Sequence, residues 1–434
     1  MTNTRPKSDG RNATRYSNGK MTTLFLTLFG LLVLCPRIGA LDLFAVASTG
    51  TADQVRAAIK KGGSVTAVDG EGHTALMYAA MNNIDPSVAK ALIELGASVS
   101  AKDKYGETPL MISCARNGIG MVKALVGAGS VLDDEDSSGN TPLMYAVTGV
   151  NAEEVEAFLL ERGARIDAIN HMGVTALAWA ADASNELGAV RALLRAGAKV
   201  TVRDSTGSTP LHFAAKDNRN ANVISELLKM GAEVDAANAA RWTPLALAAD
   251  SGNIQAVKAL LAAGANINVQ LGSDQGGTIL QQAAGNGHVD VVEALISAGA
   301  AVDGRDQVGR TPLMIASVRG QTEAARTLIA RGADLNARNS TGFVSLMYAA
   351  GEGHVETAQL LIKSGAKINA RNDDGLTPLI DASLRGFKDS VELLLNNGAD
   401  LRIKTTAGVT ALGAARRSGN QAVVDLLTAA GAKD

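Results

Sequence analysis

Apolar and polar positions alternate along this chain in a pattern that predicts pairs of short helices. Thr311–Ser317 opens with a threonine that caps free backbone N–H groups and a proline that suits the first helical position, so a helix begins there and stops near Gly320. Residues 323–330 carry apolar side chains at helical spacing and predict a second helix, which Gly332 ends. The polar residues 339–342 then predict a projecting hairpin.

The same unit recurs along the chain at steps of 33 to 35 residues. A Thr-Pro-Leu triplet or a close variant begins at Thr74, Thr108, Thr141, Thr175, Thr209, Thr243, Thr278, Thr311, Val344, Thr377 and Thr410. A second marker, glycine before a small residue, falls at Gly62, Gly96, Gly129, Gly163, Gly197, Gly231, Gly264, Gly299, Gly332, Gly365, Gly398 and Gly431. Two markers in phase indicate twelve tandem copies of one helix pair.

The small residues of the first helices predict how the copies pack. Alanine pairs such as Ala79-Ala80 and Ala214-Ala215 let neighbouring backbones approach closely, while second helices bring bulk, as in Val223, Ile224 and Leu227. One unit cannot bury these faces alone, so the units are expected to stack into a single elongated solenoid.

The units resemble ankyrin repeats. The family pattern of Thr-Pro-Leu-His, two alanines, a Gly-His turn, Val-Val, Leu-Leu and Gly-Ala-Asp is nearly complete when residues 209–235 and 278–303 are read together. The resemblance covers residues 41–434 and implies an all-α ankyrin-repeat solenoid of helix-turn-helix units with projecting β-hairpin loops. One departure is that the family histidine survives only as His212, and methionine replaces it in five units, which puts the usual side-chain hydrogen bond there in doubt.

The chain divides into four segments by these patterns. Residues 1–40 are read as a signal peptide, 41–73 as an N-terminal capping repeat, 74–409 as ten ankyrin repeats, and 410–434 as a C-terminal capping repeat. Capping units with polar outer faces keep a solenoid soluble.

The first forty residues have the three parts of a secretory signal. A basic region up to Lys20 precedes the apolar run Leu24 to Cys35, and small residues lead to a cleavage site after Ala40. We therefore expect an exported protein, periplasmic or secreted. The alternatives are an anchor formed by an uncleaved N-terminal segment, lipidation of Cys35, which Leu34 disfavours, and a true start at Met21.

The net charge of the exported chain limits the classes of partner that we expect, and its cysteine content limits the disulfides. Removal of residues 1–40 leaves 35 Lys and Arg against 42 Asp and Glu, a net charge of −7. This charge argues against nucleic acid and anionic lipid as partners, and we expect no membrane insertion of the mature chain. Cys114 is then the single cysteine, so no intramolecular disulfide forms. We expect a monomer.

The sequence contains few residues or motifs that suggest catalysis. His212, His288 and His354 occupy repeat positions, and Cys114 falls at a small core position of its helix. No metal-protease, phosphate-loop or nucleophile-elbow motif is present, so we expect no enzyme, no cofactor and no metal. The acidic turns 133–136 and 372–374 leave a metal-dependent enzyme as an alternative, although Asp also favours turns for ordinary hydrogen-bonding reasons.

In ankyrin repeats the hairpin tips and the exposed side of the first helices commonly form the recognition face. The resemblance therefore implies a non-catalytic scaffold that binds another protein, with an inhibitor or immunity protein for a basic toxin or enzyme as an alternative. Large aromatics and arginines dominate interface energetics. The candidate contact residues are Tyr105, Trp242, Phe343, Arg310, Lys104, His171, Arg116, Arg319 and Arg385.

Two adjacent hairpins in the middle of the array are atypical. Residues 238–242 lack the turn glycine of their neighbours, and residues 270–277 form the longest hairpin. They are a first candidate for the centre of the contact surface. The alternative is neutral drift, with Trp242 folded over the neighbouring hairpin, because loops tolerate change.

Overall fold

The computed structural model describes residues 40–183, 187–272 and 276–433, which form 24 α-helices and no β-strand. The helices make twelve consecutive pairs, numbered here as units 1 to 12. The first helices of the pairs are α2 (Ala40–Thr49), α4 (Ala75–Asn82), α6 (Pro109–Arg116), α8 (Pro142–Ala146), α10 (Ala176–Asp182), α12 (Pro210–Lys216), α14 (Pro244–Ser251), α16 (Ile279–Asn286), α18 (Pro312–Val318), α20 (Ser345–Gly351), α22 (Pro378–Arg385) and α24 (Ala411–Ser418).

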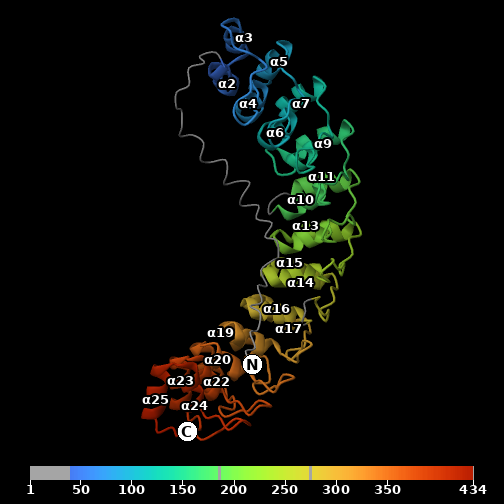
Figure 1. Ribbon diagram of the computed structural model, residues 1–434. Helices are drawn as coiled ribbons and strands as arrows, with labels where there is room; N and C mark the ends of the chain where they lie inside the picture. Colours follow the sequence, from blue (N-terminus) through green and yellow to red (C-terminus); the bar gives the residue numbers. More distant parts are fainter. Residues whose placement is uncertain (1–39, 184–186, 273–275, 434) are drawn as a thin grey trace.

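The second helices follow after short turns, and the pairs stack into a long curved array (Figure 1). They are α3 (Ala52–Lys60), α5 (Pro86–Glu94), α7 (Ile119–Gly127), α9 (Ala152–Glu161), α11 (Leu187–Arg195), α13 (Ala221–Lys229), α15 (Ile254–Ala262), α17 (Val289–Ser297), α19 (Thr322–Ala330), α21 (Val355–Lys363), α23 (Lys388–Asn396) and α25 (Gln421–Ala429). The predicted all-α solenoid is therefore confirmed.

The capping residues act where the sequence places them. The Thr311 hydroxyl accepts a hydrogen bond from the backbone N–H of Met314 at 3.4 Å, and Pro312 is the first residue of α18. Gly332 adopts a φ of 89° after α19, a left-handed conformation that glycine reaches without strain. Helix start and helix stop thus come from local chemistry that recurs in most units, although Thr141 and Val344 make no side-chain cap.

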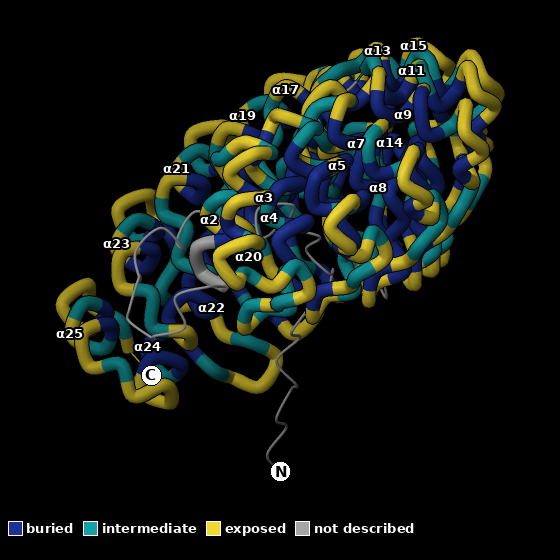
Figure 2. The backbone as a smooth tube through the Cα atoms, turned by 90° about the horizontal axis from the view of Figure 1, so that it is seen from above, coloured by how far each residue is buried: buried dark blue, intermediate teal, exposed yellow. Residues whose placement is uncertain are grey.

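The helices pack in two rows, one of first helices with small side chains and one of second helices with bulky side chains. Each first helix contacts the next first helix, and each second helix contacts the next second helix, from unit 1 to unit 12. The alanine pairs are fully buried between first helices, as at Ala79-Ala80 and Ala349-Ala350. Seen from above, the second helices from α11 to α25 lie along the outer edge of the array, where exposed residues are frequent (Figure 2).

A side chain near the start of most second helices ties each unit to the one before it. His288 Nε2 donates to the carbonyl oxygen of Asp250 at 2.8 Å, and His354 Nε2 donates to that of Val318 at 3.0 Å. Asn253 does the same from its Nδ2, to the carbonyl oxygen of Asn218 at 2.7 Å. These histidines therefore have the structural role that their repeat position predicts.

The family histidine and its methionine replacement can be compared directly. In unit 6, His212 Nδ1 accepts from the backbone N–H of Thr209 at 3.0 Å, and its Nε2 donates to the carbonyl oxygen of Trp242 at 3.1 Å. In unit 3, the Met111 sulfur accepts from the backbone N–H of Thr108 at 3.4 Å. Methionine thus keeps the cap as a weak acceptor but has no donor for the next unit.

The hairpins are tight turns closed by an Asp or Asn side chain. Asp306 Oδ1 accepts from the backbone N–H groups of Val308 and Arg310, and Asn339 Oδ1 accepts from those of Thr341 and Phe343. Within the described residues, isolated β-bridges occur in three hairpins, at Val68–Thr74, Ile169–Thr175 and Gln270–Thr278. The predicted hairpins are present as turns, without extended strands.

Unit 4 departs from its neighbours. Its first helix, α8, has five residues, and the backbone at Gly149 lies so close to the carbonyl oxygen of Cys114 that a Cβ there would overlap it. Asn151 precedes α9 with a φ of 56°, and Glu156 is fully buried at a position that is Val257 in unit 7 and Val292 in unit 8. Units 3 and 4 are therefore packed through a close backbone contact.

No helix in the described part of the chain is long and apolar enough to cross a membrane. The predicted signal peptide and its alternatives, an N-terminal anchor, lipidation of Cys35 and a start at Met21, lie outside the described residues, apart from Ala40.

Candidate interaction surface

Backbone hydrogen bonds join the hairpins of units 2 to 7 to one another, and those of units 9 to 12 to one another. Ser137 N donates to the Tyr105 carbonyl at 2.8 Å, and His171 N donates to the Ser138 carbonyl at 2.9 Å. Equivalent bonds join Ser205 to Met172, Ala239 to Thr206, Ser340 to Val308, Asp373 to Thr341 and Thr406 to Asp374. We call the hairpins and the exposed side of the first helices the hairpin face.

Tyr105 and Lys104 form an exposed pair at the tip of the unit 3 hairpin. Tyr105 is 46% exposed, and the Lys104 ammonium lies over its ring at 4.9 Å from the centroid. Lys104 also forms an ion pair with Glu71 of the preceding hairpin. The ammonium therefore holds the ring at the surface by a cation–π contact.

Trp242 and Phe343 are half-buried. Both pack against the continuous core, and the Phe343 ring lies 5.4 Å from that of Tyr348 on α20. The missing turn glycine before Trp242 is replaced by Arg241, which adopts a φ of 60°. These two aromatics contribute mainly to packing between units, with part of each ring left at the surface.

The predicted arginines and His171 are spread along the hairpin face. Arg116, Arg319, Arg385 and His171 are exposed, and Arg310 is half-buried. Arg319 Nη1 donates to Asn286 Oδ1 at 2.6 Å. Arg310 pairs with Asp306 at 2.7 Å, and Arg385 pairs with Glu352 at 2.7 Å and Asp381 at 3.2 Å. The structure places these residues along one edge but does not gather them into one cluster.

In the C-terminal units, the residue directly before the Asp or Asn that closes the hairpin is cationic, and its side chain links that hairpin to the next one. Arg305 Nη1 donates to the carbonyl oxygen of Arg338 at 2.7 Å, Arg338 Nη1 to that of Arg371 at 2.6 Å, and Arg371 Nη2 to that of Lys404 at 2.9 Å. Lys102 and Arg203 make the same bond to the next hairpin in earlier units. These cations therefore act in coupling neighbouring hairpins.

In two N-terminal hairpins the same position is apolar and exposed. Val68 is 59% exposed and Ile169 is 54% exposed, and the hairpin tip residue Met172 is 37% exposed. With Tyr105, these are the four large apolar side chains that are exposed in the described hairpins, and all lie between residues 68 and 172. Val68 and Ile169 were missed as candidates, although an apolar residue in a position that is cationic in other units is a readable signal.

The groups considered for catalysis are engaged in structure. Cys114 is fully buried, and burial raises the pKa of its thiol, which keeps it protonated. In the acidic turns, Asp133 Oδ1 accepts from the backbone N–H of Arg165, and Asp373 pairs with Arg338 at 2.6 Å. The described residues contain no group of three or more metal-ligating side chains.

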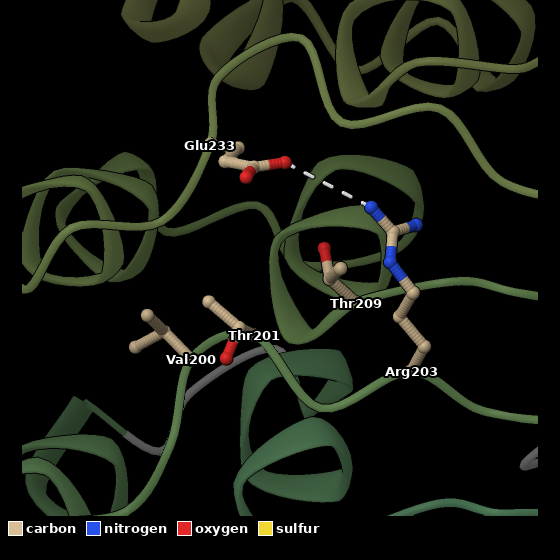
Figure 3. A pocket seen from close by; sticks show the side chains of 5 residues that line it. All are labelled: Val200, Thr201, Arg203, Thr209 and Glu233. Carbon is tan, nitrogen blue, oxygen red and sulfur yellow. Dashed lines mark ion pairs between the residues drawn. The ribbon is translucent and has the colours of Figure 1, made fainter.

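A shallow depression lies between the bases of the unit 6 and unit 7 hairpins. Figure 3 shows its lining residues, with the Arg203 guanidinium facing the Glu233 carboxylate at 3.8 Å. Arg203 also donates to the carbonyl oxygens of Gly207 and Ala237, so its donors are engaged by the protein itself. This depression therefore has the character of a junction between hairpins and not of a ligand site.

Comparison with known families agrees with the geometry. The sequence model of the family described as ankyrin repeats (3 copies) matches residues 43–136, 114–204, 177–271, 269–339 and 346–434. The matches span most of the chain, which belongs to the ankyrin repeat family. No curated protein matches the chain significantly. Ankyrin repeats are generally modules that bind other proteins.

Proposed function

We propose that this protein is an exported, non-catalytic scaffold that binds another protein through its hairpin face as a monomer. The observation that carries the proposal is the position of the four apolar hairpin residues. Large apolar side chains exposed on a rigid edge are typical of contact sites, because burying them against a partner is favourable. The contact centre then lies on the hairpins of units 2 to 5, nearer the N-terminal end than the middle hairpins that the sequence favoured.

The absence of strand edges in the described chain supports recognition by side chains instead of by strand addition. Backbone hydrogen bonds join the hairpins of units 2 to 7, so the tip residues of units 2 to 5 project from a fixed frame. A preorganised surface loses little conformational entropy on binding. Tyr105, Lys104, His171 and Arg116 lie on or beside these hairpins and would contribute directly.

Site-specific photo-crosslinking tests this proposal. The full chain would be expressed in its native cells with a photoreactive amino acid at position 105, at position 172 or, as a control, at position 258. Lys258 is exposed on α15, on the outer edge. The proposal predicts the same crosslinked protein from positions 105 and 172 and not from 258; crosslinks from 258 alone would place the contact on the second helices.

Export is tested on the same cells by fractionation and by mass spectrometry of the N-terminus. A mature chain that begins at Leu41 in the extracytoplasmic fraction supports removal of residues 1–40. An intact N-terminus in the membrane fraction would favour the anchored alternative, and an intact cytoplasmic chain would overturn export.

An inhibitor or immunity protein for a basic toxin or enzyme is a second candidate. The net charge of −7 for residues 41–434 favours a basic partner through electrostatic steering. For such a partner, the association rate constant should fall steeply as ionic strength rises.

A further inference from the structure

The Tyr145 hydroxyl lies between two carboxylates that belong to neighbouring hairpins. It is 2.8 Å from Glu107 Oε1 and 2.7 Å from Asp136 Oδ2. Glu107 ends the unit 3 hairpin, Asp136 closes the unit 4 hairpin, and Tyr145 lies on α8. A tyrosine hydroxyl carries one hydrogen and can donate it to one acceptor. Both contacts are hydrogen bonds only if one of the two carboxyl groups carries a proton of its own.

The hydrogen bonds around Asp136 suit an ionised carboxylate. Its Oδ1 accepts from the backbone N–H groups of Ser138 and Asn140, and its Oδ2 accepts from Asn140 Nδ2 at 2.9 Å. The Asp136 side chain is therefore already surrounded by donors, whereas the Glu107 carboxyl is hydrogen-bonded to the Tyr145 hydroxyl.

Of the two carboxyl groups, that of Glu107 is more readily protonated than that of Asp136. Burial raises its pKa above the ordinary value of 4.5, and the nearby Asp103 and Asp136 charges act in the same direction. The Tyr145 hydrogen bond and the more distant Arg116 act in the opposite direction without reversing the shift. The raised pKa of Glu107 agrees with the requirement that one of the two carboxyl groups carries a proton.

We propose that Glu107 and Tyr145 form a proton-dependent latch between the hairpins of units 3 and 4. In the closed latch, protonated Glu107 donates to the Tyr145 oxygen, and Tyr145 donates to ionised Asp136. When Glu107 loses its proton, two carboxylates face one hydroxyl hydrogen, and the hairpins lose one hydrogen bond and gain a like-charge repulsion.

Arg116 is the nearby cation that favours ionised Glu107, and the remaining charged groups near the latch are engaged elsewhere or add to the negative charge. Asp103 Oδ2 lies 3.5 Å from His73 Nε2, and His73 Nδ1 lies 3.1 Å from Asp69 Oδ2. Lys104 pairs with Glu71, and Lys102 donates to the Glu135 carbonyl oxygen. Glu107 is therefore the group whose ionisation changes the bond between these two hairpins.

The latch lies within the proposed contact region, although it does not depend on that proposal. Ser137 N donates to the Tyr105 carbonyl, so the backbone that carries the exposed Tyr105 ring is tied to the unit 4 hairpin. Because the folded pKa of Glu107 is raised, its contribution to stability is complete below pH 4.5 and is lost as the pH rises through the folded value. The hairpins should thus be best ordered in acid.

Hydrogen exchange of the full chain between about pH 4 and pH 8 tests the latch, after correction for the intrinsic chemical rate. Peptides covering 103–107 and 136–140 should lose protection about fivefold or more as the pH rises. Glu107→Gln, which cannot ionise, should keep one level of protection across the range. Tyr145→Phe should exchange at the faster rate at every pH.

Unit 10 provides a matched control. Tyr348 is the counterpart of Tyr145 in unit 10, but its hydroxyl accepts from the uncharged Asn339 Nδ2 at 2.9 Å. Peptides covering 339–343 should show no comparable pH dependence, and Tyr348→Phe should leave the behaviour of 103–140 unchanged. A pH response that persists in Glu107→Gln, equals that of unit 10, or is missing from the wild type would overturn the latch.

Discussion

Asn117 Nδ2 donates to the carbonyl oxygen of Asn83 at 2.8 Å, although the two residues are 34 positions apart. The same amide donates to the carbonyl oxygen of Ala80 at 3.2 Å, and Asn117 is nearly fully buried. The Asn117 amide, which belongs to the next unit, thus supplies hydrogen bonds to carbonyl groups at the C-terminal end of α4. Solenoid stability depends on such neighbour contacts, since no contact reaches across the whole array.

Replacement of Asn117 by alanine should lower the free energy of unfolding by about 1–3 kcal/mol, because buried carbonyl groups lose their donor. Urea denaturation followed by circular dichroism measures the change. Asn397→Ala is the control: its Nδ2 donates to the Leu393 carbonyl within α23 at an exposed site, so its effect should be about 0.5 kcal/mol or less. Equal losses in the two variants would contradict the role assigned to Asn117.

The close backbone contact at unit 4 predicts a large effect from a small substitution. In Gly149→Ala the new Cβ overlaps the Cys114 carbonyl oxygen, and backbone cannot move aside cheaply, so a loss of about 2 kcal/mol or more is expected. Gly127 is the last residue of α7, and a methyl group added there would meet open space. Gly127→Ala should therefore leave the stability unchanged or raise it by about 0.5 kcal/mol. Thermal unfolding of both variants compares the two sites.

The methionine positions of the Thr-Pro-Leu units are predicted to accept histidine. Met314→His should place a stronger acceptor beside Thr311 and a donor for the carbonyl oxygen of Phe343, as His212 provides for Trp242. A gain of about 1 kcal/mol is expected, and His212→Met should lose a similar amount. A loss of stability in Met314→His would show that the methionine site is too tightly packed to accept the ring.

His212 also predicts how stability changes with pH. Burial lowers its pKa below 6.5, with the nearby Arg203 acting in the same direction and the Trp242 carbonyl and Asp204 acting against it. Because the pKa of His212 is lower in the folded protein, the contribution of the neutral ring is complete above pH 6.5 and is lost as the pH falls through the folded pKa. The difference in melting temperature between wild type and His212→Met should shrink from about pH 8 to pH 5. A constant difference would argue against a neutral, buried ring.

Cys114 is expected to be inert in the folded protein. Its sulfur is fully buried and its pKa is raised, so a thiol reagent should react only as fast as the surrounding units open. Labelling of Cys114 in the native protein should be at least about a hundredfold slower than in urea-unfolded protein. Fast labelling without unfolding would contradict the buried position.

Local chemistry explains how much of this fold can be read from the sequence. Threonine caps, glycine stops and buried alanine pairs are short-range signals, so the order and phase of the helices were predicted, and His288 and His354 were recognised as structural. Burial of ring surface depends on neighbouring units. The half-burial of Trp242 and Phe343 and the left-handed Arg241 therefore become visible only in the folded array.

The sequence predicted which kinds of residue lie on the hairpin face, whereas the place on that face where a partner binds stays a prediction. The repeat phase placed Tyr105 and Lys104 at an exposed tip, as observed. Val68 and Ile169 were not among the candidates, which were chosen chiefly as aromatic and charged side chains, whereas both aliphatic side chains are exposed on the hairpins. The choice of the hairpins 238–242 and 270–277 rested on a missing turn glycine and a longer loop, which carry less physical weight than exposed apolar area.

The most direct test of the central claim is the affinity of the crosslinked partner for three purified proteins: wild type, a Tyr105→Ala and Met172→Ala double variant, and Lys258→Ala. The proposed hairpin contact predicts a loss of about tenfold or more in the double variant, since two exposed apolar side chains are removed from the interface, and no change in Lys258→Ala. Unchanged affinity in the double variant, or a loss confined to Lys258→Ala, would contradict a contact surface on the N-terminal hairpins.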